Sequence, residues 1–425
     1  MSFRLLIFLM LIQQFAFSQN IRSLDYYKNS AHENNPALLE NKNLQQFNNL
    51  QNNITLAQFR KPQINITADY LFAPFFFNYG RFISITQNPT KDAYGYDVNL
   101  SNGSLYAGQL NAALPLFSGG IIKSFNYQNS VQNEVLKNIN NQLVHDLDNN
   151  ITNQYITIYQ IQQLLTFQET IILHVEDRKK IQEVLVQKGL SQQNEYLLLD
   201  IELKQRRFDV QQLKIKLYDA FSSLNNTCLI QDSTTYIVDP PTIPLSAPRN
   251  QYNFQKKFEL DSTEVIARQE VFNIKYRPQL TAYGNAGLNS STTENIAHNT
   301  GISAGLHLLI PIYDGGQKKT VVEQNKLLLE NSRNFLKQNS ILIENNLAAL
   351  QQQINLTRQS LEMIDSELLT QETLLQILKD KVVTGQISVT DYLIALQNYE
   401  TSNQNKIQTR TNLWLLINKY NYYNW

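Results

Sequence analysis

Two long stretches of the chain contain no proline and a single glycine each, and this limits what they can fold into. Residues 121–239 have only Gly189, and residues 317–425 have only Gly385. Both stretches are rich in Leu, Gln, Lys and Glu. Because proline and glycine are the residues that most destabilise a helix interior, the sequence predicts long helices with one break in each stretch.

These stretches belong to an internal duplication with an offset of 196 residues. The segment "LPLFSGG" at 114–120 matches "IPIYDGG" at 310–316. The same offset relates Pro115 to Pro311, Gly119 and Gly120 to Gly315 and Gly316, Gly189 to Gly385, and Glu195 to Asp391. A duplication of this kind predicts two structural repeats. We place them at 19–227 and 251–425, joined by a proline-rich connector at 228–250.

Each repeat carries a predicted helix of 68 residues, at 121–188 and at 317–384, which would be about 100 Å long. The second helix has apolar residues at alternating steps of four and three, the pattern of a coiled-coil seam. Its apolar seam residues are Ile343, Leu347, Leu350, Ile354, Leu361, Ile364, Leu368, Leu375, Leu378 and Val382. The helical pattern resumes beyond Gly189 and Gly385, so each repeat is expected to form a helical hairpin with its tip at the glycine. The alternative is a glycine tolerated within one unbroken helix.

Ahead of both joints the apolar period changes to two, which predicts strands. The predicted strands are 62–72, 104–115, 278–288 and 300–311, each with one apolar face and one small or polar face. A soluble β-sandwich shows the same alternation. However, strands of this length suit a tilted crossing of the outer membrane, and about eight are the fewest that close a barrel. Four strands per chain therefore predict oligomerisation, which removes the open sheet edges.

The duplicated seven-residue segments are predicted to be the joints where a strand becomes a helix. The prolines should end strand pairing because they lack an amide hydrogen, and the glycine pairs should allow a sharp change of direction. The aromatic residues are expected at the membrane interface, and Ser118 and Asp314 are candidate N-caps. The joint residues are Pro115, Phe117, Gly119 and Gly120, then Pro311, Tyr313, Gly315 and Gly316.

The N-terminal segment 1–18 reads as a secretory signal peptide, with Arg4 ahead of an apolar run and a small-x-small site before Gln19. A buried N-terminal strand or helix is the alternative. Beyond it, basic and acidic side chains balance, so the whole chain is expected to have no field that attracts nucleic acid or acidic lipid. The single cysteine, Cys228, excludes a disulfide framework.

The sequence resembles the TolC family of outer-membrane efflux proteins over nearly the whole mature chain. The resemblance rests on "HENNPALLENKNLQQ" (32–46), on "KPQINITADY" and "RPQLTAYGNAG" at the predicted first strands, on the two joints, and on the turns "KGLSQQNEYLLLDIEL" and "TGQISVTDYLIALQNY". It implies an α+β membrane protein of the Gram-negative outer membrane, a homotrimer whose chains complete a 12-stranded β-barrel. A long periplasmic α-helical barrel of coiled-coil hairpins would continue it toward an adaptor protein and an inner-membrane transporter.

The resemblance also implies a constricted periplasmic entrance near the turns that contain Gly189, Glu195, Gly385 and Asp391. Three-fold symmetry would turn Asp391 into a ring of carboxylates that favours cations. The family pattern is incomplete, because Ile394 and Ile387 stand where an acidic and a basic residue are expected. Alternatively, Glu195 and Asp391 are first-turn acids that complement a helix dipole.

No motif for catalysis is present, and the five histidines show no metal-ligand spacing, so we expect neither an enzyme nor a cofactor. The favoured hypothesis is a passive exit duct of a tripartite efflux or type I secretion system, which exports small molecules or polypeptides. The alternatives are a periplasmic coiled-coil scaffold or surface adhesin, and a soluble binding module. The strand faces discriminate, because a scaffold has no use for an outward apolar band.

Overall fold

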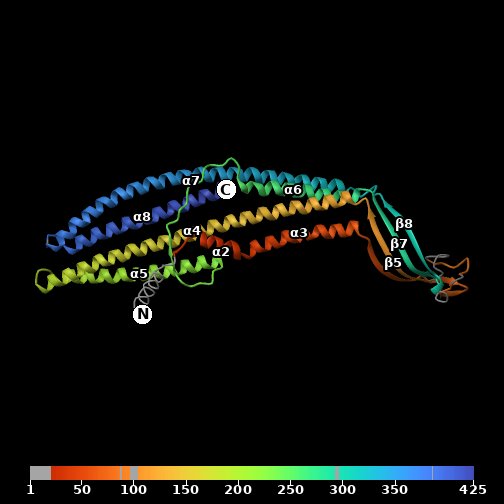
Figure 1. Cartoon of the computed structure of the whole chain (residues 1–425), viewed down its shortest axis with the longest axis horizontal. Coiled ribbons are helices and arrows are strands. Elements are labelled where there is room, and N and C mark those ends of the chain that lie inside the picture. The colour runs from red at the N-terminus through yellow and green to blue at the C-terminus, as the bar shows by residue number, and fades with distance from the viewer. Residues whose placement is uncertain (1–20, 87–88, 96–103, 292–295, 385) are drawn as a thin grey trace, which may run out of the picture. The chain divides into compact units, whose positions relative to one another are not determined.

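A computed structural model describes residues 21–425 apart from 87–88, 96–103, 292–295 and 385 (Figure 1). The predicted signal peptide and Gly385 lie outside the described residues. The chain divides into two compact units. The first unit takes Lys137–Lys257 and Phe335–Trp425 together with the segment that ends at Lys42, and the second takes Asn43–Leu136 and Phe258–Asn334. Each unit therefore draws on both predicted repeats.

The second unit contains one antiparallel sheet of four strands, in the order β2-β5-β7-β8 (Figure 1). The strands are β2 (Gln63–Phe72), β5 (Ser104–Leu116), β7 (Gln279–Ser290) and β8 (Thr300–Leu309). They correspond to the four predicted strands. A short hairpin, β3 (Phe75–Asn78) with β4 (Arg81–Ser84), follows β2. The pairing of β5 with β7 joins the two halves of the chain.

The strand register places the four apolar faces on the same side of the sheet. Ile66 pairs with Leu110, Leu110 pairs with Ala286, and Ala286 pairs with Ile302. Directly paired residues point to the same side of a sheet, so this row is apolar across all four strands. The neighbouring row is polar: Asn65 pairs with Asn111, Asn111 with Asn285, and Asn285 with Ser303.

The edge strands of this sheet are exposed on both faces. Ile66 of β2 is 80% exposed and Ile302 of β8 is 89% exposed. Among the described residues, neither β2 nor β8 has a pairing partner on its outer side. A β-sandwich would bury one face against a second sheet, and no second sheet covers this one in the described part of the chain.

Long helices follow the joints as the glycine and proline pattern predicts. Helix α4 (Gly119–Gln187) turns back as α5 (Gln193–Cys228), and α7 (Gln317–Val383) turns back as α8 (Val389–Tyr423). The shorter helices are α2 (Leu24–Asn34), α3 (Pro36–Arg60) and α6 (Asn253–Asn273). No described helix combines the length and apolar character needed to cross a membrane.

The predicted heptad seam of α7 is buried against α8 in the first unit. Ile343, Leu347, Leu350 and Ile354 form one core with Ile417 and Tyr420 of α8. Val382 lies in a second core near the tips, which joins α4, α5 and α8 through Ile171, Val175, Leu199, Leu203, Val389, Tyr392 and Leu396. The predicted seam residues of α7 therefore pack on the returning helix α8.

The proline-rich connector, residues 228–250, is held by contacts with the helices, and we call it the strap. Its first part, β6 (Ile237–Val238), pairs in parallel with β1 (Ile21–Arg22). Further along, Ile243 and Leu245 pack on the core that α7 and α8 share. Asn421 of α8 donates to the Pro244 carbonyl at 2.8 Å and accepts from the Ser246 amide at 2.9 Å. Hydrogen bonds from α8 thus fix the path between the two halves of the chain.

Candidate functional site: helical tips and strand-to-helix joints

The second joint turns at its glycine pair. Strand β8 ends before Pro311, and α7 begins after two glycines with positive φ, Gly315 at 69° and Gly316 at 84°. The Asp314 carboxylate accepts hydrogen bonds from the amides of Gly316 at 2.9 Å and Lys318 at 2.7 Å. The Tyr276 hydroxyl donates to the same carboxylate at 2.5 Å and, with these amides, lowers its pKa. The Asp314 carboxylate therefore caps the Lys318 amide in the first turn of α7, although Asp314 lies three residues before the helix and not at the predicted N-cap position.

The first joint corrects one expectation about proline. Pro115 does not end the strand: it pairs with Thr281, and β5 continues to Leu116. The pairing of β5 with β2 stops earlier, at Ala113 with Gln63. Beyond that point β5 has an open edge on the β2 side. A missing amide hydrogen at such an edge breaks no ladder bond, so proline is tolerated.

The first joint also makes its turn with a different residue. Phe117 has the positive φ, 55°, whereas Gly119 and Gly120 are the first residues of α4 and have no positive φ. A Cβ on Gly120 would lie 3.1 Å from Nη1 of Arg277, so this glycine leaves room for a neighbouring side chain. The duplicated motif therefore adopts two backbone conformations.

Ser118 and its counterpart Asp314 also make different hydrogen bonds. The Ser118 hydroxyl donates to the Phe59 carbonyl at 2.7 Å, at the end of α3. Phe59 also stacks on Phe125 of α4, with ring centroids 5.8 Å apart. The hydroxyl of Ser118 thus ties two segments together. Phe117 and Tyr313 are 90% and 88% exposed, and their expected place at the membrane interface stays a prediction.

Gly189 lies at the turn between α4 and α5. Its φ is 70°, and the Leu190 amide donates to the Leu185 carbonyl at 2.9 Å, which closes the end of α4. Glu195 lies in the first turn of α5. Its carboxylate accepts from the Ser191 hydroxyl at 2.6 Å and from Nε2 of Gln182 at 2.9 Å. Glu195 therefore links the returning helix to the outgoing one.

The second tip starts its returning helix with a capping box. The Asp391 amide donates to the Ser388 hydroxyl at 3.1 Å, and the Asp391 carboxylate accepts from the Ser388 amide at 3.3 Å. Asp391 is nevertheless exposed. Ile387, where the family pattern has a basic residue, packs against the core near the tips. Asp391 therefore takes part in the capping box of α8, and its carboxylate is still exposed to solvent.

A buried ion pair joins the two hairpins, and it was not predicted from the sequence. Arg206 of α5 contacts Glu400 of α8, and their side chains are 6% and 10% exposed. Gln168 of α4 also donates to Glu400, and Glu202 contacts Arg206 at 2.5 Å. The available signal was that Arg206 follows Leu199 and Leu203 at seam spacing, where an apolar residue is expected.

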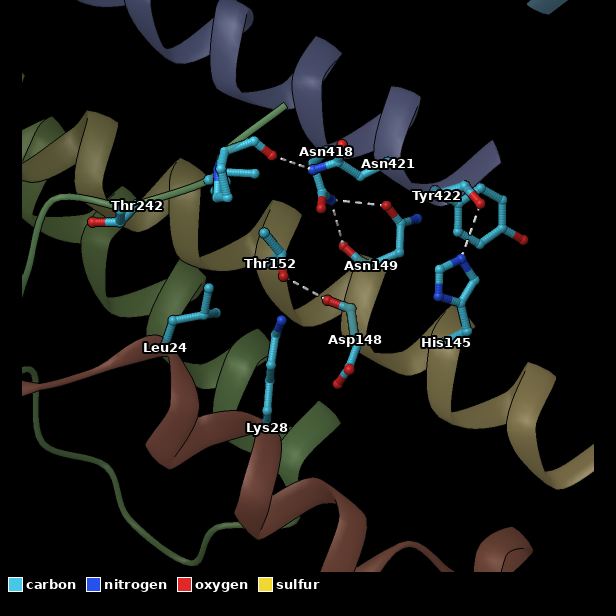
Figure 2. Close-up of a pocket in the computed structure, with 12 residues that line it drawn as sticks. Leu24, Lys28, His145, Asp148, Asn149, Thr152, Thr242, Asn418, Asn421 and Tyr422 are labelled. Atoms are coloured by element: carbon cyan, nitrogen blue, oxygen red, sulfur yellow. Dashed lines mark hydrogen bonds between the residues drawn. The ribbon is translucent and has the colours of Figure 1, made fainter. Parts of the chain in front are cut away.

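A polar cavity of about 280 Å³ lies in the first unit between α4, α8 and the strap (Figure 2). Asn418 donates to Asn149 at 2.8 Å, and Nε2 of His145 lies 2.9 Å from the Tyr422 carbonyl oxygen. The His145 ring stacks on the Trp425 ring, with the ring centroids 4.3 Å apart. Burial lowers the pKa of His145. These polar groups bond to each other, so the cavity wall fastens the end of α8 to α4.

Comparison with known proteins identifies the fold. Residues 274–414 match the family described as outer membrane efflux protein. Among curated protein sequences, none matches this chain. Solved structures do match: CusC with a TM-score of 0.72, OprN with 0.70, and the Campylobacter jejuni CmeC outer membrane channel with 0.70. The sequence identities are 14%, 15% and 14%.

These likenesses extend over most of both chains. Each match covers 94% of this chain, and it covers 91% of CusC, 89% of OprN and 85% of CmeC. OprN and CmeC are described as outer-membrane channels, and the CusC structures concern transmembrane channel formation. At such low identity, the solved structures establish only the fold. The family match covers strands β7 and β8, helix α7 and most of helix α8. The chain thus has the fold of these outer-membrane channels, and its residues 274–414 match the family described as outer membrane efflux protein.

Proposed function

We propose that this chain is the outer-membrane exit duct of a tripartite efflux or type I secretion system. Three copies form a 12-stranded barrel in the outer membrane, and their helices form a hollow periplasmic tube. The duct is passive and needs no cofactor. A periplasmic adaptor and an inner-membrane transporter supply the energy and deliver small molecules or polypeptides.

The four-stranded sheet is the observation that carries this proposal. It has one apolar and one polar face, and its edge strands β2 and β8 are unpaired on their outer sides among the described residues. Open edges and bare apolar faces are unfavourable in water. Pairing β8 of one copy with β2 of the next satisfies the edges, and lipid covers the apolar face. The polar face then lines a water-filled pore.

A second exposed seam on α7 supports assembly from several copies. Every seventh residue from 342 to 377 is uncharged and exposed, including Leu356 at 51%, Met363 at 73% and Ile377 at 48%. We call these six positions the outer stripe; they are Leu342, Ala349, Leu356, Met363, Thr370 and Ile377. A heptad stripe is a coiled-coil contact, and the partner that suits it is a helix of another copy.

The tips are proposed to form the periplasmic entrance. Three copies of Asp391 would place three exposed carboxylates around the axis, which favours cations. Its capping bond with Ser388 is compatible with this role, because one carboxylate oxygen makes it and the group stays in water. Glu195 is engaged with Gln182 and Ser191, so we assign it to the stability of the first tip.

Single-particle imaging of the protein extracted from outer membranes in detergent tests the proposal. We expect elongated particles with a detergent belt, three-fold end views and a scattering mass three times that of the chain. Thin rods without a belt would instead support a coiled-coil scaffold or adhesin. Compact particles would support a soluble module and reject the duct.

A further inference from the structure

The strand-to-helix end of the sheet carries an excess of basic side chains. Four segments meet there, because the register aligns Gln63 with Ala113, Leu116 with Leu280, and Gln279 with Leu309. These segments are residues 59–63, 113–123, 275–280 and 309–319. Contacts between the segments confirm the meeting: Ser118 bonds Phe59, and Tyr276 bonds Asp314. We call the basic residues of these segments the basic collar; they are Arg60, Lys61, Lys123, Lys275, Arg277, Lys318 and Lys319.

The charge of the basic collar is uncompensated. All seven side chains are exposed, and none makes an ion pair with a carboxylate among the described residues. The one acid in the four segments is Asp314, whose oxygens are taken by Tyr276 and two backbone amides. At the other end of the sheet, the described loops and β4 have Arg81 and Lys91 against Asp92. The positive charge is therefore concentrated at one end.

Apolar residues continue to the level of the collar. Leu116, Leu280 and Leu308 close the apolar face at this end of the sheet. Just beyond them, Ile312 is 95% exposed and Tyr313 is 88% exposed. Lys275 and Lys318 flank the Tyr276 ring, each 5.1 Å from its centroid. Where an apolar face gives way to aromatic rings and long cationic side chains, acyl chains give way to headgroups.

We propose that the basic collar binds the phosphate groups of anionic phospholipids in the periplasmic leaflet. The apolar face fixes the depth of the collar at the headgroups, and its charge complements their phosphates. Lysines and arginines at a membrane surface add attraction for anionic lipids that salt weakens. This inference rests on the proposed function, since it requires that the sheet lies in a bilayer.

Native mass spectrometry of the full-length assembly tests the inference by counting retained lipid. The protein is mixed with phosphatidylglycerol or with phosphatidylcholine, at low and high salt. The test variant is Lys123→Gln/Lys318→Gln/Lys319→Gln, which keeps the length and polarity of each side chain. The matched control is Lys326→Gln/Lys337→Gln/Lys419→Gln, which removes the same charge from exposed positions elsewhere on the helices.

We expect the natural protein and the control to retain phosphatidylglycerol over phosphatidylcholine, and the test variant to lose at least about tenfold of that preference. High salt should reduce the preference of the natural protein. Equal losses in both triple variants, or no preference in the natural protein, would overturn the inference. A collar that faces the pore would leave lipid retention unchanged and shift ion selectivity in planar bilayers, which also overturns it.

Reconstitution into phosphatidylcholine vesicles, with and without phosphatidylglycerol, separates this inference from the proposed function. Insertion without a preference for anionic lipid would reject the collar as a lipid site and leave the duct standing. Failure to insert into vesicles of either composition would reject the duct, and the lipid site with it.

Discussion

At the scale of single residues, the duplicated joint motif shows how the hydrogen bonds of one side chain affect the backbone conformation of the turn. Asp314 has two acceptor oxygens, so it can hold a hydroxyl and two amides together, and the glycines beside it take the positive φ angles. Ser118 uses its one hydroxyl as a donor to Phe59. The turn then falls on Phe117, although positive φ is costly for a bulky residue. The conformation of each joint thus depends on its neighbours as well as on the motif.

Asp391→Asn tests whether this exposed carboxylate selects ions. The amide oxygen can still accept from Ser388, so the capping box is largely kept while the charge is lost. We expect lower cation selectivity, measured as a reversal potential in planar bilayers. Ser388→Ala is the control: it removes the cap, at a cost of about 1 kcal/mol, and keeps the charge. Unchanged selectivity in Asp391→Asn would leave the residue with a structural role alone.

Asp200 should give the first hairpin a dependence on pH. Its carboxylate lies 2.5 Å from Nζ of Lys179 on α4 and 2.7 Å from Nζ of Lys204 on α5. The hydrogen bond from Lys179 is the largest of the effects that lower its pKa from 3.8 to about 2. A depressed carboxyl pKa stabilises the folded state above the unfolded pKa, and this stabilisation disappears as the pH falls from 3.8 toward 2.

Asp200→Asn should therefore melt at a lower temperature than the natural protein at pH 6, and the two should converge near pH 2. Circular dichroism at several pH values measures this. Asp219→Asn is the control, because Asp219 makes no ion pair among the described residues. If the difference in melting temperature between Asp200→Asn and the natural protein does not change with pH, the ionised Asp200 carboxylate is not the source of the stabilisation.

At the scale of secondary structure elements, two glycines that pair with each other across the sheet differ in whether they tolerate a side chain. A Cβ on Gly287 of β7 would lie 2.1 Å from the Gly108 carbonyl oxygen, and this backbone contact cannot relax without separating β5 from β7. Its partner Gly301 on β8 has no atom within 4 Å of such a Cβ. Gly287→Ala should fail to reach the outer membrane, whereas Gly301→Ala should assemble normally. Quantitative blots of membrane fractions measure both, and normal assembly of Gly287→Ala would disprove this close packing.

The buried pair between α5 and α8 makes a prediction about stability. Glu400→Leu leaves the buried Arg206 with only the partly exposed Glu202 as a carboxylate partner, so it should destabilise the folded chain by up to about 3–5 kcal/mol. The joint change Arg206→Met/Glu400→Leu removes both charges and should cost less than Glu400→Leu alone. Thermal melts compare the variants. If the double variant is the less stable, the pair contributes more than its burial costs.

The elements could be predicted from sequence where local pattern decides them. Alternation placed the strands, and the scarcity of proline and glycine placed the long helices within one or two residues of their observed ends. Contacts between distant segments could not be predicted. Arg206 and Glu400 are 194 residues apart, the pairing of β5 with β7 joins two repeats, and Asn421 holds the strap from a different part of the chain. Neither repeat alone contains the information that fixes these contacts.

At the scale of the whole molecule, the surface of α7 favours the proposed assembly of several copies. Its inner seam is buried against α8 through Ile343, Leu347, Leu350 and Ile354. Its outer stripe lies on a different side of the helix and faces solvent. A helix with two uncharged stripes is typically packed on two sides. The open edges of β2 and β8 point to the same conclusion from the sheet.

Met363→Glu tests whether the outer stripe is a contact between copies. Met363 lies in the middle of the stripe and is 73% exposed in the single chain. A carboxylate buried in a coiled-coil seam is strongly disfavoured, so the variant should dissociate to smaller species as the protein is diluted in detergent. Light scattering measures the mass at each concentration. Leu369→Glu is the matched control, since Leu369 is 69% exposed on the same helix but outside the stripe. Because α7 keeps its inner seam in both variants, a helix signal that persists while the mass falls in Met363→Glu alone would place the defect between copies. Equal dissociation of both variants would mean that the outer stripe has no special role in assembly.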